Sequence, residues 1–172
     1  MKKIHLREFL NSIYPISSNT WNKIEPLFIE KKLKKGDYFV KEGENLNEIA
    51  FLEEGIARAF YRNSKGIEYN KHFFINPCFI GPYSSLVTKK QNQINQQVLT
   101  DTIILVVNYT QFSAFYETCF DLHTIARKLA ELFFVQKEQR EIDIVLLDAE
   151  KRYQLFQNQY SFIEQQIPQY HI

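Results

Sequence analysis

The chain has 172 residues, enough for one domain of ordinary size or for one domain with an appendage. Hydrophobic residues make up 45% and charged residues 24%, which excludes wholesale disorder and predicts a core that needs no disulfides or metals. The net charge of +1 argues against DNA contact by these residues alone, because free-standing nucleic-acid binders carry a strong basic excess.

Several further classes of protein lack support in the sequence. The start, Met1–Glu8, has no apolar segment of the kind found in signal peptides, and no stretch approaches the roughly 18 apolar residues of a membrane span. Cys78 and Cys119 are too few for a disulfide framework or an iron–sulfur cluster, and we expect both to be small buried hydrophobes. These features predict a cytoplasmic protein that does not contact a membrane.

Enzymatic and metal chemistry also lack a recognisable pattern. The four histidines show no metal-ligand spacing, so we expect no metal and no cofactor. The chain contains no nucleophile elbow, P-loop or dinucleotide fingerprint. We therefore do not expect an enzyme.

Residues 1–32 are expected to form short helices. Apolar residues from Ile4 to Ile13 recur at the spacing of one helical face, and Pro15 ends the pattern. Residues 17–20 offer several N-cap side chains for a second short helix that carries Trp21 and Phe28.

Residues 33–112 are expected to be β-structure. All five glycines lie here, at separations of 7, 12, 11 and 15 residues, which is typical of the turns in an all-β sandwich or barrel. Between them lie short runs rich in aromatic and branched residues, at 38–40, 49–52, 56–61 and 67–74. Asn63–Gly66 is expected to form a hairpin turn, and Ile103–Val107 a buried strand.

Residues 113–147 are expected to form one long helix, followed by a second helix that Asp148 caps within the segment 148–172. About 25 helical residues would extend about 37 Å, too far for one small β-roll to cover. A second copy of the chain is the simplest source of the missing cover, so we expect a homodimer. The expected interface is the periodic stripe formed by Leu122, Ile125, Ala126, Leu129, Leu132, Phe133 and Gln136.

Four segments, in this order, resemble parts of the CRP/FNR family of bacterial transcription regulators. Lys35–Gly43, Ile49–Gly55 and Gly66–Tyr69 resemble successive strands and turns, and Asp148–Tyr153 resembles the helix that leads to the family's DNA-binding domain. The resemblance implies a mainly β fold with flanking helices. It would be a double-stranded β-helix, or jelly roll, of the cyclic-nucleotide-binding type, followed by a long C-terminal dimerisation helix.

The end of the sequence resembles the beginning of the family's helix-turn-helix. Ile167–Ile172 is similar to the entry to its first helix, and no recognition helix follows. We therefore expect a sensor and dimerisation region truncated before the helix-turn-helix, with DNA contact only through a missing C-terminal domain.

Relatives that bind cyclic nucleotides carry a Phe-Gly-Glu stretch and then an Arg-Ser/Thr-Ala stretch that holds the phosphate. Here Gly81 matches, but Pro82 replaces the glutamate and removes both a carboxylate and a backbone donor. Asn92 and Gln93 fall at the positions of the arginine and the hydroxyl residue, and residues 63–126 contain no arginine. A buried phosphate needs the two parallel hydrogen bonds that an arginine guanidinium donates, so we do not expect cyclic AMP or cyclic GMP to bind.

The corresponding residues form a degenerate candidate pocket for which several interpretations stay open. It could accept an unknown small-molecule effector through neutral polar groups, be filled by aromatic side chains, or be bypassed by a stimulus acting on the long helix; its polar side chains could also be ordinary loop residues. We expect a regulatory domain, with a constitutive dimerisation or protein-interaction module as the alternative. The candidate pocket residues are Phe79, Gly81, Pro82, Tyr83, Ser84, Ser85, Asn92, Gln93 and Lys137.

Overall fold

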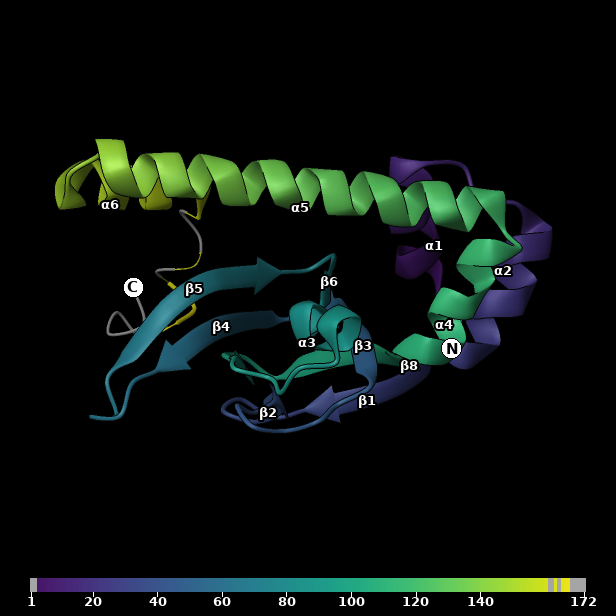
Figure 1. Ribbon diagram of the computed structural model, residues 1–172, viewed down its shortest axis with the longest axis horizontal. Helices are drawn as coiled ribbons and strands as arrows, with labels where there is room; N and C mark the ends of the chain where they lie inside the picture. Colours follow the sequence, from purple (N-terminus) through teal and green to yellow (C-terminus); the bar gives the residue numbers. More distant parts are fainter. Residues whose placement is uncertain (1–2, 161–162, 164, 168–172) are drawn as a thin grey trace.

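The computed structural model shows a β-roll flanked by helices, with one long helix passing over it (Figure 1). It describes residues 3–160, 163 and 165–167, so most of the predicted entry to a helix-turn-helix lies outside the described residues. The helices are α1 (Ile4–Ile13), α2 (Ser18–Ile24), η1 (Glu25–Leu27), α3 (Tyr83–Thr88), α4 (Tyr109–Ser113), η2 (Ala114–Glu117), α5 (Phe120–Leu146) and α6 (Ala149–Gln159).

Two antiparallel sheets of four strands each form the roll, which confirms the predicted fold class. The first sheet has the order β1-β8-β3-β6 and the second the order β2-β7-β4-β5. The strands are β1 (Ile29–Leu33), β2 (Tyr38–Val40), β3 (Glu48–Glu54), β4 (Ile56–Arg62), β5 (Glu68–Ile75), β6 (Cys78–Ile80), β7 (Asn95–Val98) and β8 (Thr102–Asn108).

The central strands β3 and β8 of the first sheet are buried on both faces, which explains why they are nearly continuous apolar runs. In β3, Ala50 and Leu52 point into the roll, where a cluster of side chains from both sheets surrounds them. Ile49 and Phe51 point the other way, into a second cluster beneath the helices. Successive residues of a strand face opposite sides, so one strand serves two cores.

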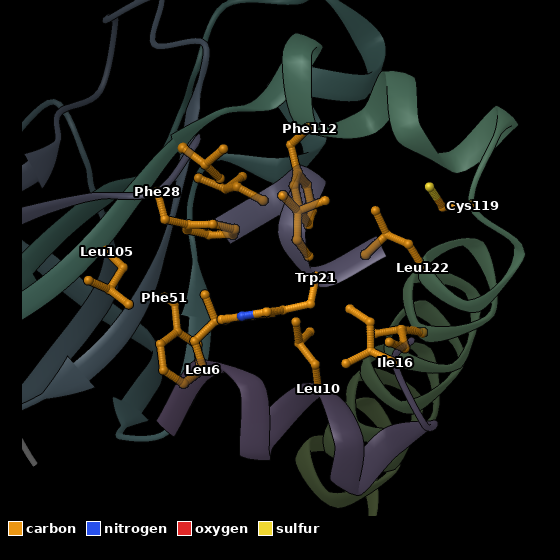
Figure 2. Close-up of a cluster of buried hydrophobic side chains, with 14 of the residues drawn as sticks. Leu6, Leu10, Ile16, Trp21, Phe28, Phe51, Leu105, Phe112, Cys119 and Leu122 are labelled. Atoms are coloured by element: carbon orange, nitrogen blue, oxygen red, sulfur yellow. The ribbon is translucent and has the colours of Figure 1, made fainter. Parts of the chain in front are cut away.

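That second cluster joins α1, α2, α4 and the beginning of α5 to the roll, and Figure 2 shows its side chains converging. Trp21 is 5% exposed and Leu6 is fully buried, and the rings of Phe28 and Phe112 lie 5.4 Å apart. Cys119 belongs to the cluster at 4% exposed, as expected of a small buried hydrophobe. Cys78 is half-buried, and burial raises the pKa of its thiol to about 12.

The predicted local signals are found where expected. The Ser17 hydroxyl accepts from the backbone N–H of Thr20 at 3.1 Å, and the Asp148 carboxylate accepts from that of Lys151 at 2.9 Å, so both act as N-caps. Between β4 and β5, Gly66 closes the hairpin with a φ of +81°, a conformation that favours glycine.

Two predicted boundaries differ from the structure. The helical segment expected over 1–32 ends at Leu27, and Ile29–Leu33 instead forms an edge strand paired with β8. The long helix expected from 113 begins at Phe120, after the separate short helices α4 and η2. In both places apolar spacing continues across a change of backbone, so periodicity could not locate the change.

Beyond α5 the chain returns to the roll. Phe156 of α6 and Tyr160, the residue that follows α6, pack edge-on against Phe73 of β5, with ring centroids 5.6 and 6.3 Å away. Ile163, fully buried, and Ile167, at 5% exposed, complete this third cluster on the outer face of the second sheet.

Candidate functional site

The segment that corresponds to the family's phosphate cassette connects β6 to α3. Gly81 has a φ of +152°, and a Cβ there would lie 3.1 Å from the Ile49 side chain, so the close approach to β3 requires a glycine. Pro82 is buried and takes the N-cap position of α3, where it supplies neither a side-chain cap nor an N–H. The loop therefore keeps the glycine's packing role without the polar groups of a phosphate site.

Two predicted pocket residues pack toward the helices and not into the roll. Phe79 lies against Phe9 and Phe51 in the core beneath α1, with ring centroids 5.9 and 5.5 Å away. Tyr83 is 53% exposed and packs edge-on against Tyr109, 5.8 Å away. Burial, and then the bond with Tyr83, raise the pKa of Tyr109 to about 12. Neither ring contributes to a pocket within the roll.

The remaining hydroxyl, amide and ammonium groups of the predicted pocket do not converge on one place. Ser84 and Gln93 are exposed, and Ser85 is half-buried on α3. Lys137, at 73% side-chain exposure, lies 3.6 Å from Glu141 one turn along α5. A surface ion pair of this kind is weak and fixes no ligand.

Asn92 is corrected from a candidate ligand residue to a structural one. It is 3% exposed, and its Nδ2 donates to the carbonyls of Lys41, at 2.7 Å, and Ile94, at 2.8 Å. Its Oδ1 accepts from the backbone N–H of Ile94 at 3.1 Å. All of this amide's polar atoms are used in joining two loops, and none is directed at a ligand.

The structure identifies a further candidate ligand-binding residue, Gln96, that was not among the predicted pocket residues. Its Nε2 donates to the Gly81 carbonyl at 3.0 Å, and the residue is 2% exposed. Its Oε1 is buried and has no hydrogen-bond partner among the described residues. The sequence did contain one indication of this residue. An amide in a short strand flanked by apolar residues is expected to be buried, and a buried polar group calls for an explanation.

His72 lies on the same face of the second sheet as Gln96. Ala59 of β4 pairs with His72 on one side and with Gln96 on the other, so the three form a row across the strands. Burial lowers the pKa of His72 to about 4, and the positive charges of Arg140 and Lys71 contribute. His72 is therefore neutral at pH 7.

Arg140 of α5 contacts the roll close to His72. Its Nη2 donates to the Asn70 carbonyl of edge strand β5 at 3.3 Å. In Figure 1, α5 passes above β5 after leaving the N-terminal helices. The second sheet, its edge strand and α5 thus meet around His72.

Arg58 is buried against the second sheet, but its guanidinium is not available to bind a phosphate. At 4% exposed, its guanidinium donates to the Gln97 Oε1 at 2.8 Å and lies 2.6 Å from the Glu68 carboxylate. Burial opposes ionisation of Glu68, but hydrogen bonds from Arg62 and Arg58 hold its pKa below the ordinary value. Arg58 pairs with Phe73, which contacts α6, so this network lies on the outer face of the sheet.

The predicted dimer stripe is corrected at its first two members. Leu122 and Ile125 are each 1% exposed because they pack against α1 and α2 of their own chain. Leu129 also packs against this core. Leu132, Phe133 and Gln136 share that helix face but are exposed, Leu132 at 53% and Phe133 at 44%, so their place in a dimer interface stays a prediction.

The opposite face of α5 carries exposed apolar residues that the periodic stripe did not include. Phe134, Val135 and Val145 are 66%, 61% and 80% exposed, and Ile142 is 43% exposed. At about 100° per residue, these four positions lie within one side of the helix, away from Leu129 and Arg140. We call them the far face of α5.

Elsewhere, a cavity of about 370 Å³ opens between α1 and the ends of β3 and β5, lined by His5, Glu8, Phe9, Ser12, Glu53, Asn76 and Pro77. The His5 Nδ1 lies 2.7 Å from the Glu53 carboxylate across it. Within the described part of the chain, no three His, Cys, Asp or Glu side chains gather as a metal site, and no helix is long and apolar enough to cross a membrane.

Residues 30–119 match the family model described as the cyclic nucleotide-binding domain, and the match covers just over half of the chain. The chain belongs to the cyclic nucleotide-binding domain family. The matched residues include the whole β-roll except Ile29, together with the cassette segment and α3. No curated protein matches the chain.

Solved structures share the fold at low sequence identity. A protein from Eubacterium rectale assigned to the CRP/FNR family of transcriptional regulators has a TM-score of 0.71 at 13% identity, covering 87% of this chain and 69% of that one. The catabolite activator protein of Thermus thermophilus has a TM-score of 0.64 at 16% identity, covering 78% and 61%.

A kinase subunit has the same fold. The regulatory subunit of a cAMP-independent protein kinase A from Trypanosoma brucei has a TM-score of 0.63 at 15% identity, covering 76% of this chain and 46% of that one. At these identities the likeness establishes the fold alone. The chain spans about 61% of the length of the Thermus protein it matches.

Proposed function

We propose that this chain is the sensor and dimerisation region of a CRP/FNR-type transcription regulator that does not respond to cyclic AMP or cyclic GMP. The lack of response to cyclic nucleotides is supported by one observation: the segment that corresponds to the phosphate cassette lacks phosphate-binding groups. Pro82 stands buried at the N-cap of α3, and the amide at the expected arginine position is fully used by Lys41 and Ile94.

The chemistry of a cyclic phosphate supports this reading. An enclosed phosphate charge needs a bidentate guanidinium or several N–H donors to offset its loss of water. The described segment from Phe79 to Val98 contains no arginine, and its two lysines, Lys89 and Lys90, are exposed. A hydrated ammonium on a loop is a poor substitute for a buried guanidinium.

A regulatory role is supported by the path of α5. Its first turns are fixed in the core beneath α1, whereas every residue from Ala130 to Glu141 is exposed. Arg140 then contacts β5. A ligand between β5 and α5 would favour one position of the free half of the helix over another, which is a population shift.

The structural neighbours fit the proposal at the level of the fold. The Eubacterium protein is a transcriptional regulator by name, the Thermus protein is a catabolite activator, and the Trypanosoma protein is the regulatory subunit of a kinase described as independent of cAMP. Use of this fold without cyclic AMP therefore has a parallel. Contact with DNA is assigned to none of the described residues.

The test is binding of cyclic AMP and cyclic GMP to the purified chain, by isothermal titration calorimetry and thermal shift. We expect no heat of binding and no rise in Tm at 1 mM of either nucleotide, whereas a site saturated at 100 times its Kd would add about 2.7 kcal/mol. A cyclic-nucleotide-binding catabolite activator protein measured in parallel serves as the positive control. Micromolar binding of either nucleotide to this chain would refute the proposal.

The alternative is a constitutive dimerisation module whose roll has no ligand. The exposed apolar far face of α5 favours this function, because it predicts association without any effector. The two functions differ in whether a small molecule changes the stability of the dimer.

A further inference from the structure

The cavity between α1 and the ends of β3 and β5, which we call the α1 cavity, has one wall made by a single side of α1. Its volume of about 370 Å³ is that of a pocket for a small ligand. Leu6 and Leu10 of the same helix point into the hydrophobic core instead (Figure 2). The residues that α1 contributes to the cavity are spaced three and four positions apart, and they are His5, Glu8, Phe9 and Ser12.

Glu53 of β3 faces α1 across this cavity. The pairing of β3 with β8 skips Glu53, because Leu52 and Glu54 lie opposite consecutive residues of β8, so Glu53 is the extra residue of a β-bulge. A bulge changes the direction of a side chain relative to the regular strand. The Glu53 carboxylate is directed at α1, where its Oε1 lies 2.7 Å from the His5 Nδ1.

The second oxygen of this carboxylate is the observation that points to a ligand. The Glu53 side chain is 11% exposed, and its Oε2 is buried without a hydrogen-bond partner among the described residues. In the described part of the chain, no lysine or arginine forms an ion pair with Glu53. A largely buried carboxylate is costly without a second donor and a cation, and a ligand with positively charged N–H groups would supply both.

A second carboxylate gives the α1 cavity an excess of negative charge. Glu8 lines the cavity from an exposed position on α1, and it takes part in no ion pair among the described residues. The lining includes two carboxylates and one imidazole, but no lysine or arginine. The charge of the lining therefore favours a cation.

The lining suits an organic cation better than a metal ion. Among the described residues, no three His, Cys, Asp or Glu side chains come close enough together to hold a metal. Phe9 and Pro77 add apolar surface to the lining, against which a short carbon chain can pack.

We propose that the α1 cavity binds a small aliphatic ammonium ion, and a diamine in preference to a monoamine. One ammonium group donates to the Glu53 Oε2, and the second lies against the exposed carboxylate of Glu8. The site is separate from the cassette and from α5, and it does not depend on the proposed function. A bound diamine joins α1 to β3 and so stabilises the packing of this helix on the roll.

The test is isothermal titration calorimetry of the whole chain with three four-carbon probes at matched ionic strength. 1,4-Diaminobutane carries two ammonium groups, butylamine carries one, and 1,4-butanediol carries none. We expect butylamine to bind about threefold more weakly than diaminobutane, because an ion pair with an exposed carboxylate contributes little. Butanediol should not bind, since it cannot neutralise Glu53.

Two neighbouring glutamates of β3 separate binding in the cavity from general surface charge. Glu53→Gln should weaken diaminobutane about tenfold, because it removes the buried charge while keeping an oxygen for His5. Glu54→Gln removes an exposed carboxylate that does not line the cavity, and it should leave the Kd unchanged.

Glu8→Gln tests the second ammonium group without altering a buried residue. It should reduce the binding of diaminobutane to that of butylamine and leave the Kd of butylamine unchanged. Because Glu8 is exposed, this result does not depend on whether Glu53→Gln folds. An unchanged preference for the diamine in Glu8→Gln would contradict the proposed placement.

The proposal is overturned if diaminobutane does not bind at about 10 mM, a concentration at which even a weak site would be occupied. It is also overturned if butanediol binds as tightly as diaminobutane, if Glu53→Gln behaves like Glu54→Gln, or if calcium chloride binds more tightly than the diamine. Titration with cyclic AMP or cyclic GMP tests the proposed function and leaves this site unaffected.

Discussion

Two buried amides four residues apart, Asn92 and Gln96, have opposite hydrogen-bonding states. Asn92 satisfies its polar atoms with backbone groups of Lys41 and Ile94, so it stabilises a loop junction. Gln96 satisfies only its nitrogen, and its oxygen stays unpaired. A buried acceptor without a donor costs about 1–3 kcal/mol, so a hydrogen-bond donor that reached the Gln96 Oε1 would be stabilising.

Sequence alone could not distinguish these two residues. Counting along the chain placed Asn92 at the family's arginine position, but its role depends on Lys41, a residue 51 positions away. Gln96 was not selected because its interest depends on register with Ala59 and on the approach of Gly81. Side-chain partners across strands follow from the sheet pairing, which composition and spacing do not specify.

His72 provides a prediction at the residue scale. Its pKa is about 4 in the folded chain and about 6.5 in the unfolded chain, because burial and the charges of Arg140 and Lys71 disfavour the imidazolium. The unfolded state therefore binds more protons as the pH falls below 6.5, and stability is lost. Between pH 7.5 and 5.5 we expect the free energy of unfolding to decrease by about 1 kcal/mol through this residue.

Urea unfolding at several pH values measures this loss. His72→Gln should flatten the dependence between pH 7.5 and 5.5, whereas His123→Gln, at an exposed position on α5, should retain the wild-type slope. An unchanged slope in His72→Gln would show that His72 is not the group responsible.

At the scale of elements, α5 is one helix with two different partners. Its first turns complete the core of its own chain through Leu122 and Ile125, and its later turns leave apolar side chains uncovered. The sequence predicted its existence and length because apolar spacing persisted. It assigned the whole periodic stripe to a second copy, whereas the part from Leu122 to Leu129 packs against the chain's own helices, since periodicity identifies an apolar face but not what covers it.

The packing of α6 on β5 gives a prediction for that element. Ile163 is fully buried against the cluster around Phe73, and Ile163→Ala should lower the free energy of unfolding by about 2–4 kcal/mol if α6 unfolds together with the roll. Hydrogen exchange should then increase throughout α6. Gln165→Ala removes an exposed side chain two residues away and should change neither measurement. If Ile163→Ala increased exchange in α6 without changing global stability, α6 would be a separately folding unit.

At the scale of the whole molecule, the regular turn spacing predicted the β-roll correctly, because each glycine lies between two successive elements. The short helices before the roll and the cap at Asp148 were also predicted. The boundaries at Leu27 and Phe120 were not, and neither was the return of α6 to the second sheet. Those features depend on contacts between segments far apart in sequence.

The far face of α5 leads to a prediction about assembly. Exposed apolar side chains spaced along one side of a long helix are covered most simply by the same face of a second copy, in a two-fold arrangement. The first turns of α5 are covered by the chain itself, whereas Phe134, Val135, Ile142 and Val145 of the far face are exposed and available to a partner. We therefore expect the chain, of mass 20.6 kDa, to sediment as a dimer at micromolar concentration.

Charged substitutions on the two faces identify the interface. Val145→Glu, on the far face, should convert the dimer to a monomer, since two buried carboxylates would oppose each other across the symmetry axis. Leu132→Glu, at 53% exposure on the roll-facing side, should leave the dimer intact. Equilibrium sedimentation of both variants separates the alternatives. Dissociation by Leu132→Glu alone would show that the periodic stripe forms the interface. A monomeric wild-type chain would contradict dimerisation through α5 altogether.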